Sequence, residues 1–152
     1  MLPLALVKKR ILKKIHRKII KILSLSRQQI RELGFQAIFA LEINSDQDKA
    51  LLKKTLFEQN TIDDYFNELV DGVFAVHKEL EEEYKPYLKD NWSLKRISKT
   101  ADIAMQIGVF ELTKRIDIPK KVSLDQATEL AKNFGDESDG KFVNGVLAHF
   151  VS

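Results

Sequence analysis

The sequence predicts an all-α protein of about seven helices, either one domain or two small helical halves that share a core. Apolar residues recur at spacings of three and four along the chain, which is the period of an amphipathic helix. Six glycines and three prolines leave little material for turns, so long helices with short connections are favoured over many short strands. With 44% hydrophobic and 31% charged residues, the 152-residue chain has the composition of an ordinary globular protein.

The first 26 residues differ in charge from the rest of the chain. They hold eight lysines and arginines and no acid, which leaves 17 basic and 22 acidic side chains in the other 126 residues, a net charge of −5. The mildly acidic remainder can therefore bind nucleic acid only through a local patch. Ile11, Ile15 and Ile19 recur between the charges and predict a basic amphipathic N-terminal helix.

Three interpretations of this leader, residues 1–25, stay open. It is too short and too charged to cross a bilayer, so stable membrane insertion is not expected, and it lacks the apolar run of a secretory signal. The helix could lie on an anionic membrane or an RNA backbone, or dock its apolar stripe on residues 26–152. Alternatively, it is extra sequence from an upstream start codon, and the working protein is the helical domain at 26–152.

Local signals place the remaining helices in order. Ser26 and Gln29 form the capping-box pattern S-x-x-Q at the start of the first of them. The expected elements are helices at 27–43 and 47–58, a helix from the Asn60-Thr61 cap to Lys85-Pro86, a turn at 94–98 capped by Ser93, and helices at 100–115, 123–134 and 140–151. The segment from Asp136 to Gly140 is expected to be a polar loop.

Two glycines need an explanation of their own. Gly108 lies inside the predicted helix at 100–115, where glycine costs about 1 kcal/mol relative to alanine. We therefore expect another helix to pack closely against it. Asn144-Gly145 is a hairpin signature, but apolar residues keep helical spacing on both sides of it, and so a helix is favoured.

The sequence gives little support for catalysis or for a metal or cofactor site. The absence of cysteine excludes disulfides, thiolate metal sites and cysteine nucleophiles, and is consistent with a cytoplasmic protein. His77 lies on an apolar stripe, where a hydrogen-bonded core histidine is favoured over a ligand or base. The acidic run 81–83 points three ways around a helix and cannot converge on one ion. We therefore expect a non-enzymatic protein without cofactors.

A few spots have the chemistry of RNA recognition. Arg27 and Arg31 are separated by four residues and so share a helix face, beside a helix N-terminus that favours phosphate. Gln28 adds a neutral donor. Tyr87 follows Lys85-Pro86, and Lys141 precedes Phe142, which puts a basic group beside an aromatic ring as single-stranded RNA recognition requires. Phe142 fits a core position equally well.

Several segments resemble the NusB family of transcription antitermination factors. Arg31-Glu32 followed by Gln36-Ala37-Ile38-Phe39 is similar to the family's R-E-x-x-x-Q-A-L-Y, and the segment 85–88 is similar to its P-Y-L. Residues 110–119 resemble Y-E-L-x-x-R-x-D-x-P, and 129–134 resemble E-L-A-K-x-F. Residues 141–147, K-F-V-N-G-V-L, match the C-terminal motif in full. The resemblance spans about 26–150.

The resemblance implies an all-α fold of two small packed bundles that binds boxA-type single-stranded RNA together with the ribosomal protein NusE. The pair would join the antitermination complex on RNA polymerase and support rRNA transcription. The residues that we predict for RNA contact are Arg27, Gln28, Arg31, Tyr87, Lys141 and Phe142.

This chain also departs from the family pattern, which commonly has further arginines at Gln28, Gln29, Asp102 and Gln106. Asp102 and Gln106 are instead predicted for partner binding. Fewer phosphate contacts predict weaker RNA binding with a lower salt dependence. A helical protein-interaction scaffold that has lost specific RNA binding is therefore an alternative function, and a membrane-surface protein dependent on the leader is a third.

Overall fold

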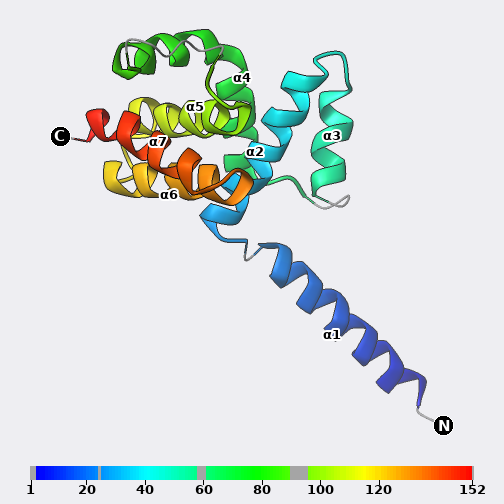
Figure 1. Cartoon of the computed structure of the whole chain (residues 1–152). Helices are drawn as coiled ribbons and strands as arrows, with labels where there is room; N and C mark the ends of the chain where they lie inside the picture. Colours follow the sequence, from blue (N-terminus) through cyan, green and yellow to red (C-terminus); the bar gives the residue numbers. More distant parts are fainter. Residues whose placement is uncertain (1–2, 24, 58–60, 90–95, 152) are drawn as a thin grey trace.

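The computed structural model describes residues 3–23, 25–57, 61–89 and 96–151, and in these ranges it contains seven α-helices and no strand. The prediction of an all-α protein is confirmed. The helices are α1 (Leu4–Leu23), α2 (Arg27–Ile43), α3 (Lys49–Leu56), α4 (Asp64–Tyr84), α5 (Lys99–Lys114), α6 (Lys120–Phe134) and α7 (Glu137–Leu147). Two 3-10 turns, η1 (Lys85–Tyr87) and η2 (Ala148–Phe150), follow α4 and α7. Helices α2 to α7 pack into one body, and α1 extends away from it (Figure 1).

Helix α5 lies at the centre of the body. All residues from Ala101 to Leu112 are buried, because α2, α4, α6 and α7 each contact this helix. Helix α2 packs with α3 and α4, while α6 and α7 pair with each other, so α5 joins two packed groups (Figure 1). A helix that is apolar on most of its surface is expected to be surrounded in this way.

The close packing predicted at Gly108 is confirmed. A Cβ atom added there would lie 2.6 Å from Leu147 Cδ1 of α7 and 2.9 Å from Ala127 Cβ of α6. The glycine therefore lets three helices approach one another, which offsets its low helix propensity. Asn144-Gly145 lies inside α7, so the helix is also confirmed over the hairpin signature.

Some predicted boundaries were wrong. The segment from Asp136 is the start of α7 rather than a loop, because the Asp136 side chain accepts from the backbone N–H of Asp139 and the Asp139 side chain accepts from that of Asp136. Polar residues that cap a helix look like a loop in sequence. Helix α4 begins after Asp63, whose side chain accepts from Phe66 N, and α6 begins at Lys120. The expected Ser93 cap and Asn60 lie outside the described residues.

Leu51, Phe74 and Phe134 lie at apolar positions of their helices, where helical spacing predicts burial, but their side chains are exposed. Phe74 lies instead beside the ammonium of Lys49, whose Nζ is 5.2 Å from the ring centroid. None of the described helices combines the length and the apolar character needed to cross a membrane.

Candidate nucleic-acid interface

The start of α2 is built by the predicted capping box. The Ser26 Oγ atom accepts from the backbone N–H of Gln29 at 3.0 Å, and the Gln29 Oε1 atom accepts from the backbone N–H of Ser26 at 2.8 Å. This fixes the first turn of the helix and leaves Arg27 exposed on it. The unpaired N–H groups of a helix start favour a negatively charged ligand, so Arg27 lies where a phosphate would be attracted.

We predicted that Arg31 shares this exposed face with Arg27, and the prediction was wrong, because Arg31 is buried. Its side chain is 3% exposed, and it donates from Nε to Glu111 Oε2 at 2.7 Å and from Nη2 to Glu111 Oε1 at 3.0 Å. Glu111 comes from α5, and it also accepts from the hydroxyls of Tyr65 and Ser123. A bidentate pair with further hydrogen bonds satisfies both buried charges. Arg31 therefore holds α2 against α5.

Arg27 is held by the ring of Tyr65. The guanidinium carbon of Arg27 lies 4.0 Å from the ring centroid, and that of Arg115 lies 4.9 Å from it. Burial raises the pKa of Tyr65, and the Glu111 charge raises it further, so the phenol stays a neutral donor. Arg115 forms ion pairs with Glu68 and Asp117, whereas Arg27 forms none with any residue in the described ranges. Its guanidinium can therefore contact an anion, in a pocket that Asp63, Asp64 and Glu68 also line.

Gln28 is partly committed to the fold. Its Nε2 lies 3.5 Å from the carbonyl oxygen of Gln126 in α6, and its Oε1 accepts from Arg31 Nη1 at 3.4 Å. Both contacts are long, so the amide can exchange them for others at small cost. Gln28 therefore borders the Arg27 surface without being fully exposed.

The two basic–aromatic pairs predicted for RNA contact differ in how far their rings are exposed. Tyr87 in η1 is exposed, and its ring stacks on His149 with a centroid distance of 4.5 Å and meets Phe150 edge-on at 5.4 Å. Lys141 is exposed on the first turns of α7, but the neighbouring Phe142 is half-buried and packs against the core. Sequence reasoning missed the partners His149 and Phe150, because they lie more than 60 residues away from Tyr87.

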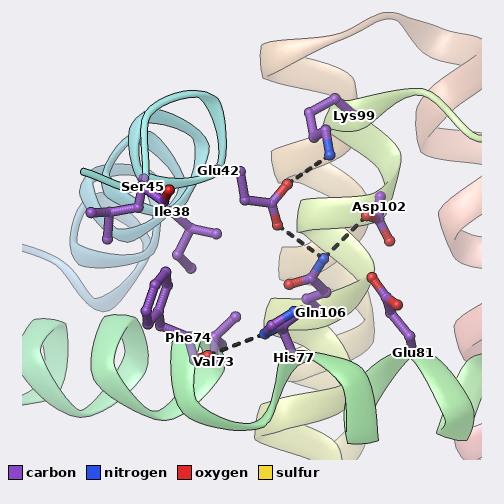
Figure 2. Close-up of a pocket in the computed structure, with 11 residues that line it drawn as sticks. Ile38, Glu42, Ser45, Val73, Phe74, His77, Glu81, Lys99, Asp102 and Gln106 are labelled. Carbon is purple, nitrogen blue, oxygen red and sulfur yellow. Dashed lines mark hydrogen bonds and ion pairs between the residues drawn. The ribbon is translucent and has the colours of Figure 1, made fainter. Parts of the chain in front are cut away.

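Asp102 and Gln106 lie together in an acidic pocket between α2, α4 and α5 (Figure 2). Asp102 accepts from the hydroxyl of Tyr84 and from Gln106 Nε2, which also donates to Glu42 at 3.3 Å. The Gln106 Oε1 atom is buried and has no hydrogen-bond partner among the described residues. The cavity has a volume of ≈ 380 Å³ and is lined by Ile38, Leu41, Glu42, Ser45, Val73, Phe74, His77, Glu81, Lys99, Asp102 and Gln106.

The pocket has more negative than positive charge. Lys99 pairs with Glu42 at 2.8 Å, which leaves Glu81 and Asp102 without an ion pair in the described part of the chain. Burial raises the pKa of Asp102, as does the Glu42 charge, and burial together with the Asp102 charge raises the pKa of Glu81. No group of metal-ligating side chains in the described ranges converges closely enough to hold an ion. The pocket is thus suited to an organic cation that can donate hydrogen bonds.

His77 belongs to this pocket rather than to the core that we predicted for it. The ring is half-buried at the rim, and its Nδ1 lies 3.2 Å from the carbonyl oxygen of Phe74 (Figure 2). The backbone of α4 leaves helical geometry at Val76, with φ −121° and ψ 22°. This local distortion changes the direction of the helix just before His77, which is why the residue departs from the stripe that regular spacing predicts.

Comparison with known proteins places these features in a family. The sequence profile of the NusB family matches residues 28–152. The transcription antitermination protein NusB of Levilactobacillus brevis is 40% identical over 132 residues, which cover 84% of this chain and 93% of that protein. NusB of Ligilactobacillus salivarius is 39% identical, covering 85% of this chain and 100% of the relative.

Solved structures agree with the sequence relatives. NusB of T. maritima superposes with a TM-score of 0.69 at 31% identity, over 83% of this chain and 90% of that one. A crystal structure of the antitermination factors NusB and NusE in complex with dsRNA has a TM-score of 0.70 at 25% identity, over 82% of this chain and 94% of that one. On these matches, the chain belongs to the NusB family.

Proposed function

We propose that this protein is a non-enzymatic RNA-binding adaptor of transcription antitermination in the cytoplasm. It binds boxA-type single-stranded RNA together with the ribosomal protein NusE, enters the antitermination complex on RNA polymerase and supports rRNA transcription. Family membership supports the proposal, as does the similarity to a NusB that was crystallised with NusE and RNA. The preference for single-stranded RNA rests on the basic and aromatic residues predicted for RNA contact.

One observation carries the RNA part of this proposal, namely the guanidinium of Arg27. It is exposed at the start of α2, lies 4.0 Å from the centroid of the Tyr65 ring and forms no ion pair within the described ranges, although Asp63, Asp64 and Glu68 line the same pocket. The ring orients it, and the helix start adds N–H donors beside it. Arg27 therefore has what a phosphate contact needs, which is charge, access and a fixed direction.

The direct test measures RNA affinity with the full chain in the presence of NusE. Arg27→Gln removes one phosphate contact, so we expect weaker binding of boxA RNA and a salt slope reduced by about one. Lys54→Gln, which removes one exposed charge from α3, is the matched control and should leave both quantities unchanged. Equal affinity of the parent for boxA and scrambled RNA would contradict the boxA assignment.

For the partner, we propose that the acidic pocket receives a basic side chain of NusE. The surplus of carboxylates and the unpartnered Gln106 Oε1 atom both favour a cationic donor. Glu81→Gln removes one charge from the rim and should weaken NusE binding. Glu83→Gln, two residues along the same helix and exposed, is the control. If both variants bind NusE as the parent does, the pocket is not the contact.

A scaffold without specific RNA binding is the second candidate function. The burial of Arg31 and the contacts of Gln28 favour it, because they remove two of the three polar groups predicted for RNA on α2. If the protein is a scaffold, it should bind NusE normally. The Arg27→Gln and Lys54→Gln variants should then have the same RNA affinity and the same salt slope. The same pair of measurements therefore separates the two functions.

A further inference from the structure

Helix α1 is not accounted for by the proposed function. The NusB family profile begins at residue 28, after α1 has ended. In Figure 1 the helix extends away from the body, with its N-terminus far from α2 to α7. Side chains from Leu4 to Lys18 are exposed, apart from the half-buried Val7. This helix therefore presents most of its surface to solvent.

The surface of α1 has two chemically different faces. At the helical period, the apolar residues Leu4, Val7, Ile11, Leu12 and Ile15 fall within one arc. Leu12 is 64% exposed and Ile11 53% exposed, so this stripe is not covered by the body. The opposite arc carries five cations, Lys9, Arg10, Lys13, Lys14 and Arg17, and the first 26 residues contain no acid.

We propose that α1 binds the surface of an anionic phospholipid membrane, lying in its plane. The apolar arc would enter the boundary between headgroups and acyl chains, and the cationic arc would meet the lipid phosphates. Lys8 and Lys18 lie within the apolar arc, and their long side chains can extend their ammonium groups to the headgroups. This is peripheral binding, since α1 is not apolar enough to cross a membrane.

The positive charge of α1 would also complement RNA, but the apolar arc favours a lipid surface over RNA. An RNA backbone would neutralise the lysines and arginines while leaving five aliphatic side chains in water. A lipid surface takes up both faces at once. The inference is independent of the proposed function, because it concerns a helix outside the residues that match the family.

The test is flotation of the full chain with vesicles of phosphatidylglycerol and phosphatidylcholine, compared with phosphatidylcholine alone. We expect binding to the anionic vesicles and at least about tenfold weaker binding to the neutral ones. Leu12→Gln with Ile15→Gln changes the apolar arc without changing charge, and should weaken binding about tenfold or more. Leu6→Gln, the same type of exchange on the cationic arc, is the control and should have little effect.

Three results would overturn the proposal. These are no vesicle binding by the parent chain, equal binding to neutral and anionic vesicles, or an unchanged affinity in the Leu12 and Ile15 double variant. RNA as the occupant is tested with a second variant, Lys13→Gln with Lys14→Gln and Arg17→Gln. If this triple variant loses RNA affinity and the parent chain does not bind vesicles, α1 binds RNA rather than lipid. The substituted side chains are exposed on α1, so the variants should leave helices α2 to α7 folded, and a change in binding can be assigned to α1.

Discussion

The ion pair between Arg31 and Glu111 makes Glu111→Gln a severe change despite its conserved shape. Glutamine has nearly the same size, but it carries no charge and brings an NH2 group toward donors. Arg31 Nε and Nη2, the Tyr65 hydroxyl and the Ser123 hydroxyl all donate to the two carboxylate oxygens. After the change, at least one of these donors faces another donor, and the buried guanidinium has lost its counter-charge.

The magnitude follows from burial. The side chains of Arg31 and Glu111 are 3% and 1% exposed, so water cannot replace the lost carboxylate. Removing one partner of such a pair costs about 3–5 kcal/mol. A domain of this size has a free energy of unfolding of about 5–15 kcal/mol, and so the variant should lose about a fifth or more of it. The pair between Lys132 and Glu137 is largely exposed, and Lys132→Gln should cost less than about 1 kcal/mol.

The assay is urea unfolding followed by circular dichroism at neutral pH, with midpoints compared at equal slope. Glu111→Gln should shift the midpoint far more than Lys132→Gln. A double variant, Arg31→Met with Glu111→Leu, should recover part of the lost stability, because it leaves no buried charge without a partner. The recovery should be incomplete, because the hydroxyls of Tyr65 and Ser123 lose their acceptor. If Glu111→Gln and Lys132→Gln cost the same, the pair is not formed in solution. Arg31 would then be free to join Arg27 on an RNA-binding face.

Three further predictions concern packing and titration. Gly108→Ala places a Cβ atom 2.6 Å from Leu147 Cδ1 and should destabilise by about 1–3 kcal/mol in thermal melts, whereas Gly145→Ala has open space and should stabilise by up to about 1 kcal/mol. Burial and the charge of a neighbouring aspartate raise the pKa of Glu81. A cationic partner group prefers its ionised form, so NusE affinity measured by calorimetry should fall as pH drops through that raised pKa, and Glu81→Gln should lessen the fall. Although burial opposes it, hydrogen bonds from two lysines of α3 lower the pKa of Asp71. Its stabilisation is present above the unfolded-state pKa and lost as pH falls through the folded one, so Asp71→Asn should be less stable than the parent at neutral pH, by less than about 1 kcal/mol, and equal to it in acid.

Features encoded by near neighbours in the chain were predictable. Ser26 and Gln29 are three residues apart, so their capping box can be recognised in the sequence itself. Gly108 was predictable as a contact because its cost within a helix requires a compensating neighbour. The spacing of apolar residues likewise predicted most helices, since one helix face must be buried whatever covers it.

Features that depend on distant residues were not predictable. Arg31 and Glu111 are 80 positions apart in the sequence. The spacing within α2 places Arg31 on the same helix face as Arg27, but it does not show that α5 covers the part of this face that holds Arg31. Tyr65 shows the same limit, because its ring contacts Arg27 while its hydroxyl binds Glu111. The acidic pocket needs side chains from α2, α4 and α5, and single-helix patterns cannot assemble it.

Helix α2 contributes to both candidate sites, and its packing against α5 constrains how RNA and partner can influence each other. Arg27 lies at the start of α2 and Glu42 near its end, while Asp102 and Gln106 precede Glu111 along α5. Between the two sites, the bidentate pair of Arg31 and Glu111 fixes one helix against the other. A closely packed, fully bonded contact of this kind leaves no second arrangement for a ligand to select. Any cooperativity between RNA and NusE should therefore arise from direct contact between the two ligands, and it should persist in Arg27→Gln even as RNA affinity itself declines.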